Sequence, residues 1–199
     1  YYQSGRLSRS ADSYSIAIQK YPNFLRAHKN LAFVNLGLGN YKEAALGFSK
    51  AISLGEGDGV TFVALGYCYY LLEQFVSAEN AYRMGIVLLP ESKDAQNGLV
   101  NCLLGTNRFS EALALLNELL SKEPDNIYCH LARASALIGL GLEKEATVAL
   151  ETLRRMGNYT AQDLIRLGDL YHNLKLYDLS LKNYERALLN EKKLSTQKY

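Results

Sequence analysis

Small residues recur along the chain at a fixed interval, and each is followed by an aromatic residue or leucine four positions later and by a small or apolar residue seven positions later. The small residues are Ser10, Ala44, Ala78, Ala112, Ala146 and Ser180, and each step is 34 residues. Spacings of three and four place side chains on one face of a helix. The pattern therefore predicts a helix around each of these six positions, which we call the anchors.

A second apolar cluster with helical spacing precedes the anchors in the same register. Before Ala78 it consists of Phe62, Leu65, Gly66 and Tyr69. All three prolines of the chain, Pro22, Pro90 and Pro124, stand twelve residues after an anchor, where proline is expected to end a helix. Each period therefore predicts two helices, and such pairs must stack on their neighbours to bury their apolar faces.

This pattern resembles the tetratricopeptide repeat (TPR) family. The third repeat matches most closely, through Phe62, Leu65-Gly66, Tyr69, Ala78, Tyr82 and Pro90. The resemblance extends over essentially the whole chain. One departure is the absence of tryptophan, since His28 and His130 stand at the first aromatic position of their repeats.

The resemblance implies an all-α fold, a right-handed α-solenoid of antiparallel helix pairs. In this fold the small anchors allow close helix contacts, and aromatic residues such as Tyr82 fill the gaps between repeats. We expect a single repeat domain over residues 1–199 with a last helix that ends near Glu191. The expected segments are a partial repeat 1–24, repeats 25–58, 59–92, 93–126, 127–160 and 161–194, and a tail 195–199.

Composition and charge restrict the class of partner. Hydrophobic residues make up 48% of the chain and charged residues 21%, which is typical of a folded globular protein. The formal net charge of +2 is too small to predict a nucleic acid or an anionic membrane as partner. The longest uncharged run, residues 59–72, is shorter than the roughly twenty residues that span a bilayer. We therefore expect a protein partner, no nucleic acid and no membrane.

The cysteines Cys68, Cys102 and Cys129 have no disulfide or metal-site spacing, which favours a reducing, cytoplasmic setting. Cys68 and Cys102 occupy the same position in adjacent repeats. They are interpreted as small buried residues, with a redox pair as the alternative.

Candidate chemistry is otherwise scarce. The histidines lack metal-ligand spacing, and no catalytic constellation is evident. The glycine clusters at 37–39 and 55–59 are not followed by the Lys-Ser/Thr pair of a phosphate loop, so we interpret them as turns. We predict no enzymatic activity, no catalytic or metal site and no cofactor.

The resemblance implies a binding groove, because in this family the first helix of each repeat lines a concave surface that holds a peptide or a partner helix. The corresponding groove residues here are Arg26, Lys29, Phe33, Val63, Tyr67, Tyr70, Asn97, Asn101, Leu131, Ser135, Ile165 and Asp169. Arg26 and Lys29 are expected to favour an acidic residue of the partner.

Two features refine this expectation. Some family members bind chaperone C-termini through a carboxylate clamp; Lys29 fits that clamp, but Phe33, Ala64, Asp94 and Gly98 do not. Asn97 and Asn101, four residues apart, could both donate to and accept from a peptide backbone, or they could be ordinary solvated side chains.

Three classes of function remain. The leading one is a scaffold that binds a partner peptide or helix in the groove. The second is a regulatory or targeting segment of a larger enzyme or of a secretion or assembly protein, and the third is a helical repeat that binds single-stranded RNA. The chain is interpreted as a fragment whose Tyr1 and Tyr2 come from a missing first helix, and its exposed N-terminal repeat is expected to form a homodimer.

Overall fold

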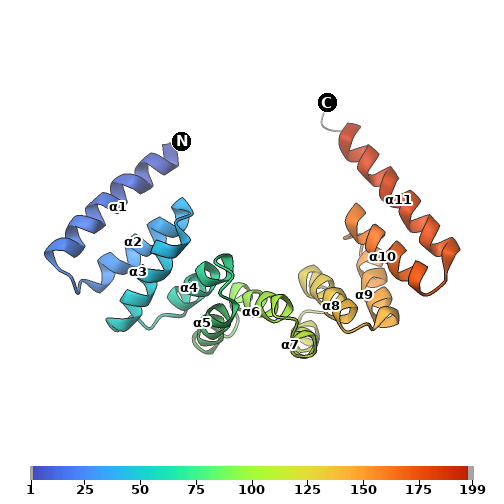
Figure 1. Ribbon diagram of the computed structural model, residues 1–199, viewed down its shortest axis with the longest axis horizontal. Coiled ribbons are helices and arrows are strands. Elements are labelled where there is room, and N and C mark those ends of the chain that lie inside the picture. The colour runs from blue at the N-terminus through green and yellow to red at the C-terminus, as the bar shows by residue number, and fades with distance from the viewer. Residues whose placement is uncertain (1, 197–199) are drawn as a thin grey trace. The chain divides into compact units, whose positions relative to one another are not determined.

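The computed structural model describes the backbone of residues 2–196 and the side chains of residues 7 and 9–190, and this part of the chain contains helices and no strand (Figure 1). The all-α fold is therefore confirmed. The helices are α1 (Tyr2–Lys20), α2 (Leu25–Leu38), α3 (Tyr41–Ser53), α4 (Gly59–Leu71), α5 (Phe75–Leu88), α6 (Lys93–Gly105), α7 (Phe109–Lys122), α8 (Ile127–Gly139), α9 (Glu143–Arg155), α10 (Ala161–Asn173) and α11 (Tyr177–Thr196).

The chain divides into two compact units, Tyr1–Thr106 with α1 to α6 and Asn107–Tyr199 with α7 to α11. The boundary falls between the two helices of the predicted repeat 93–126 rather than between repeats.

Within each unit the predicted helix pairs are present as contacting neighbours. In the first unit α2 packs on α3 and α4 on α5, and in the second unit α8 packs on α9 and α10 on α11. In the first unit α4 also contacts α2 and α6, so the first helices of successive repeats lie side by side (Figure 1). This arrangement builds one face of the unit from first helices alone.

The turn inside each repeat has the same backbone conformation. In this turn one residue adopts a positive φ, which places it in the left-handed region that commonly follows a helix. These residues are Gly39 (80°), Glu73 (57°), Asn107 (58°), Gly141 (71°) and Lys175 (61°), again 34 positions apart. The turn interpretation of the glycine clusters is thus confirmed for Gly39.

Four first helices begin at a side-chain cap, and the caps also recur every 34 residues. The cap oxygen accepts a hydrogen bond from the backbone N–H three residues later, which satisfies a donor that the helix leaves unpaired. The caps are Asp58 (2.7 Å), Ser92 (3.3 Å), Asn126 (3.1 Å) and Thr160 (3.2 Å).

The anchors form the centre of the packing. Ala44, Ala78, Ala112 and Ala146 are fully buried, as the close approach of paired helices requires. Each unit has its own apolar core, around Phe48 and Leu65 in the first and around Leu150 and Leu167 in the second.

The histidines at the first aromatic position have a structural role that the repeat pattern does not predict. The Nε2 atoms of His28 and His130 lie 2.8 and 2.7 Å from the carbonyl oxygens of Pro22 and Pro124. Gln96 donates in the same way to Pro90, at 2.6 Å. Where the proline is absent, the equivalent positions hold apolar Phe62 and Leu164. A polar residue therefore accompanies each proline and pairs with its carbonyl group.

The chain ends differ from the prediction in two places. Tyr2 belongs to α1, which continues unbroken to Lys20, so it does not come from a separate first helix. The last helix extends past Glu191 to Thr196, because the segment after Glu191 holds neither proline nor glycine. Tyr1 and the side chain of Tyr2, on which the predicted homodimer depends, lie outside the described residues.

Candidate functional site

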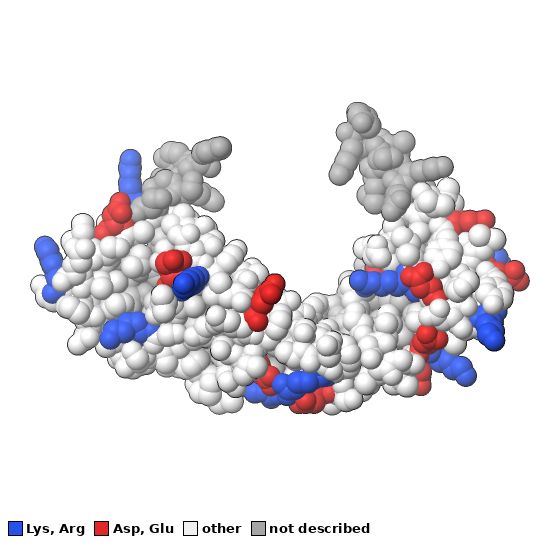
Figure 2. Space-filling model, in the orientation of Figure 1, with Lys and Arg blue, Asp and Glu red and all other residues white. Residues whose placement is uncertain are grey.

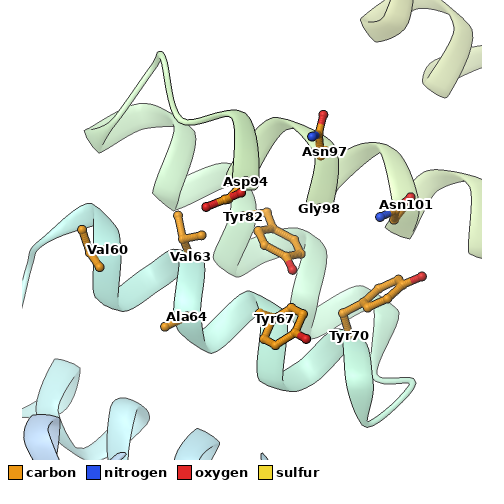
Figure 3. Close-up of a pocket in the computed structure, with 10 residues that line it drawn as sticks. All are labelled: Val60, Val63, Ala64, Tyr67, Tyr70, Tyr82, Asp94, Asn97, Gly98 and Asn101. Atoms are coloured by element: carbon orange, nitrogen blue, oxygen red, sulfur yellow. The ribbon is translucent and has the colours of Figure 1, made fainter. Parts of the chain in front are cut away.

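A pocket of about 500 Å³ opens in the first unit between α4 and α6 (Figure 3). Nine of its ten lining residues come from these two first helices, and the tenth comes from α5. The lining residues are Val60, Val63, Ala64, Tyr67, Tyr70, Tyr82, Asp94, Asn97, Gly98 and Asn101.

Five of the predicted groove residues meet in this pocket. Val63, Tyr67 and Tyr70 project from α4, and Asn97 and Asn101 project from α6. Tyr67 is 46% exposed, so its side chain remains accessible to a ligand. Tyr70 is half-buried, and its ring packs against that of Phe75 in a T-shaped arrangement with a centroid distance of 5.7 Å. The pocket thus presents one accessible tyrosine and one tyrosine held by its neighbour.

Tyr82 lies at the base of the pocket, where it had been expected only to fill a gap between repeats. It is 3% exposed, and its ring approaches the backbone of two glycines on the flanking helices. A Cβ atom on Gly66 would lie 2.9 Å from the Tyr82 ring, and one on Gly98 would overlap it. The two glycines are the sequence signal that could have identified Tyr82 as part of the site.

The charge in the pocket comes from one residue. Asp94, the second residue of α6, is the only lining residue with a formal charge, and it is exposed. Burial, with smaller contributions from Cys102, Tyr67 and Tyr70, raises the pKa of Tyr82 well above its ordinary value. The phenol at the base therefore stays protonated and neutral at physiological pH.

One of the two residues at the predicted basic end of the groove, Lys29, is neutralised within the chain. Lys29 pairs with Asp58 and, at 2.9 Å, with Glu56. Hydrogen bonds first with Asp58 and then with Glu56 raise the pKa of Lys29 and keep it charged. Arg26 is exposed on α2 and does not line the pocket. Two carboxylates therefore already match the Lys29 charge that was expected to attract an acidic partner.

The other predicted residues lie away from the pocket. Phe33 packs edge-on against Phe48, with ring centroids 4.8 Å apart, and so belongs to the core of the first unit. In the second unit Leu131 packs on the core, and the Ser135 hydroxyl donates to the Leu131 carbonyl at 3.2 Å. These contacts give all three residues structural roles.

The remaining two predicted residues lie on α10. Asp169 accepts a hydrogen bond of 2.7 Å from the Tyr184 hydroxyl, and Ile165 is half-buried. The structure thus gathers five of the twelve predicted residues into one site and leaves the others on separate surfaces or in the cores.

Cys68 and Cys102 are both buried, and burial raises the pKa of each thiol to about 11. A protonated, inaccessible thiol is a poor nucleophile, which fits packing rather than redox chemistry. Among the described residues no group of three or more His, Cys, Asp or Glu side chains could hold a metal ion. No helix in this part of the chain has the length and apolar character needed to cross a membrane.

Known proteins share both the sequence pattern and the fold. Two family models, each described as tetratricopeptide repeat, match residues 1–59 and 72–136. Over 90 residues, or 45% of this chain, the sequence is 27% identical to the general transcriptional corepressor trfA of Dictyostelium discoideum. The chain spans only 6% of the length of that curated relative.

Solved structures support the same fold. MamA from Desulfovibrio magneticus RS-1, residues 41 to the end, superposes with a TM-score of 0.78 at 14% identity, over 85% of this chain and 96% of that one. YrrB, described as a TPR protein with an unusual peptide-binding site, superposes with a TM-score of 0.73 at 16% identity, over 95% of this chain and all of that one. Since the family models together match more than half of the chain, the chain belongs to the tetratricopeptide repeat family.

Proposed function

We propose that this chain binds an extended peptide segment of a partner protein in the pocket between α4 and α6. Proteins of this family act in general as protein-interaction scaffolds and are generally not catalysts. The observation that carries the proposal is the pocket itself, because it is lined by Val63, Tyr67, Tyr70, Asn97 and Asn101, the central residues of the predicted groove. The description of YrrB as having a peptide-binding site supports a peptide as the ligand.

The chemistry of the lining suits a peptide. Tyrosine is a frequent hot-spot residue at protein interfaces, since it buries a large area and keeps a polar tip. The amides of Asn97 and Asn101 can each donate to a carbonyl and accept from an N–H group of a peptide backbone. A volume of about 500 Å³ is within the usual range of ligand pockets and accommodates a side chain with its adjoining backbone.

The same lining disfavours single-stranded RNA. Proteins that bind single strands combine stacking aromatic rings with basic side chains that contact the phosphates. The pocket has tyrosines, but none of its ten lining residues is Lys or Arg. The face over α4 and α6 is also mostly uncharged in the space-filling view (Figure 2).

The test is a binding measurement on the whole chain with peptides selected from a random nonapeptide library. We expect Tyr67→Ala to weaken binding of the selected peptides at least tenfold, because hot-spot truncations cost about 2 kcal/mol or more. Asn101→Ala should also weaken binding. The control is Arg83→Ala on α5, whose side chain pairs with Glu79 at 2.8 Å and does not line the pocket.

Circular dichroism melts of each variant establish that it is folded before binding is compared. Loss of binding in Arg83→Ala, with both pocket variants unaffected, would place the site on the second-helix face and contradict the proposal. Selection of no peptide at all, but tight binding of single-stranded RNA, would also contradict it.

A further inference from the structure

We propose that the pocket selects a basic side chain of the partner, arginine in the first place, held between the tyrosines and Asp94. This inference rests on the proposed function and specifies the partner: an extended segment with an arginine that enters the pocket. It reverses the expectation from the sequence, in which Arg26 and Lys29 were to attract an acidic residue.

The first argument is the balance of charge. Asp94 is the only charged residue among the ten that line the pocket, and it makes no ion pair with any described residue. Of the two cations expected to favour an acidic ligand, Lys29 is already paired with Glu56 and Asp58, and Arg26 does not line the pocket. The lining therefore carries a single formal charge, which is negative, and a basic ligand complements it.

The second argument is the aromatic lining. Tyr67 and Tyr70 present their rings at the pocket, and the buried Tyr82 at its base points its hydroxyl toward the side on which they lie (Figure 3). A cation over the face of such a ring is attracted by the ring quadrupole. The phenol oxygens can also accept hydrogen bonds from a guanidinium group.

The third argument is the match to the shape of an arginine side chain. Its apolar stem suits Val60, Val63 and Ala64, while its planar head carries five N–H donors. An acidic side chain would meet the carboxylate of Asp94 and the negative ring faces. A wholly apolar side chain would cover phenol and amide groups without giving them hydrogen bonds, which carries an energetic cost.

Asp94 also has a structural role that must be separated from ligand binding. A carboxylate in the first turn stabilises a helix through the helix dipole. Asp178 provides a matched control, because it is exposed and is the second residue of α11 just as Asp94 is the second residue of α6. Asp94→Asn and Asp178→Asn should therefore have similar small effects on thermal stability, and only the first should change binding.

The experiment uses the nonapeptides selected on the whole chain, with blocked termini so that end charges do not contribute. We expect arginine to be enriched at one peptide position, with lysine second. Replacing that arginine by citrulline, a neutral residue of nearly the same shape, should weaken binding about tenfold or more. Asp94→Asn should weaken binding of the arginine peptide to a similar extent and leave the citrulline peptide unchanged, whereas Asp178→Asn should affect neither. Added salt should weaken binding of the arginine peptide more than binding of the citrulline peptide.

The outcomes separate this inference from the proposed function. If the selected peptides depend on Tyr67 but carry an acidic or apolar residue at the inserted position, the peptide site stands and the basic specificity is overturned. Equal binding of the arginine and citrulline peptides would overturn it as well. If no peptide depends on Tyr67, both proposals fail.

Discussion

The ring of Tyr82 occupies the space that Gly98 leaves open on the neighbouring helix. A Cβ atom on Gly98 would overlap the hydroxyl end of this ring, at Cζ and both Cε atoms. Tyr82 is on α5 and Gly98 on α6, so the contact joins two successive repeats and also forms the base of the pocket. The next repeat carries Leu116 and Ala132 at the equivalent positions, a smaller side chain opposite a larger one.

Gly98→Ala should therefore destabilise the chain, although alanine is the better helix former. The added methyl group forces the buried ring to move, and overpacking of this kind costs about 1–3 kcal/mol. The gain in helix propensity offsets at most about 1 kcal/mol of this. Chemical denaturation of the variant measures the net loss.

Two further variants test the cause of this loss. Gly105→Ala, at the end of the same helix, places its Cβ 3.4 Å from the Phe75 ring and should leave stability nearly unchanged. The double variant Gly98→Ala/Tyr82→Leu copies the pair found in the next repeat and should recover much of the loss. If the double variant is less stable than Gly98→Ala alone, steric overlap with Tyr82 is not the cause.

Much of the fold could be predicted because its signals repeat every 34 residues. The anchors, the prolines and the apolar spacing each recur in several copies, so a substitution in one repeat, such as Ser180 for alanine, does not hide the period. Five pocket residues were predicted for the same reason, since positions that face outward in one first helix face outward in the next.

The rest of the site depends on contacts that have no period. Tyr82 reaches the pocket from a second helix only because Gly66 and Gly98 lack side chains. Lys29 is neutralised by Glu56 and Asp58, which lie in the junction before the next repeat. Such pairings arise from individual residues brought together in space, and the repeat pattern does not encode them.

The left-handed turn residues make a second prediction. Gly141 has a φ of 71°, and a Cβ atom there would meet nothing within 4 Å. Gly141→Ala should nevertheless lower the free energy of unfolding by about 1 kcal/mol, because the left-handed conformation is unfavourable for residues with a Cβ atom. Gly57→Ala is the control: its Cβ also meets nothing, but its φ is not positive, so stability should not fall. Equal losses of unfolding free energy in the two variants would show that backbone conformation does not determine the change in stability.

The proline-linked hydrogen bonds make a third prediction. His130 is buried, and its Nε2 lies 2.7 Å from the carbonyl oxygen of Pro124. Because Gln96 donates to Pro90 from the equivalent position, His130→Gln should change stability by less than about 0.5 kcal/mol. His130→Leu removes the donor and should cost about 1 kcal/mol. Thermal melts that rank the leucine variant at or above the glutamine variant would contradict this role.

Glu151 makes the last prediction, a dependence of stability on pH. Its carboxylate accepts hydrogen bonds from the Arg154 Nε atom at 2.8 Å and from the Tyr171 hydroxyl at 2.9 Å. Burial alone would raise the pKa of Glu151, but these hydrogen bonds and the charges of Arg154 and Arg155 together outweigh burial and hold the pKa below its ordinary value of 4.5. Because the folded state has the lower pKa, the unfolded chain binds the proton more tightly. The stabilisation is therefore complete above the ordinary glutamate pKa and is lost as the pH falls through the lowered value.

Unfolding free energies of wild type and Glu151→Gln, measured from neutral pH downward, test this coupling. The variant should be less stable at neutral pH, and the difference should shrink below the ordinary glutamate pKa, because the wild type then loses the charged acceptor. Glu118→Gln is the control, since Glu118 pairs with Lys122 at 3.0 Å on an exposed helix face, where ion pairs contribute little. The unfolding free energy of this control should depend on pH in the same way as that of the wild type. The difference in unfolding free energy between wild type and Glu151→Gln could instead stay constant down to acidic pH. That result would mean that packing around residue 151, and not its charge, stabilises the α9–α10 contact.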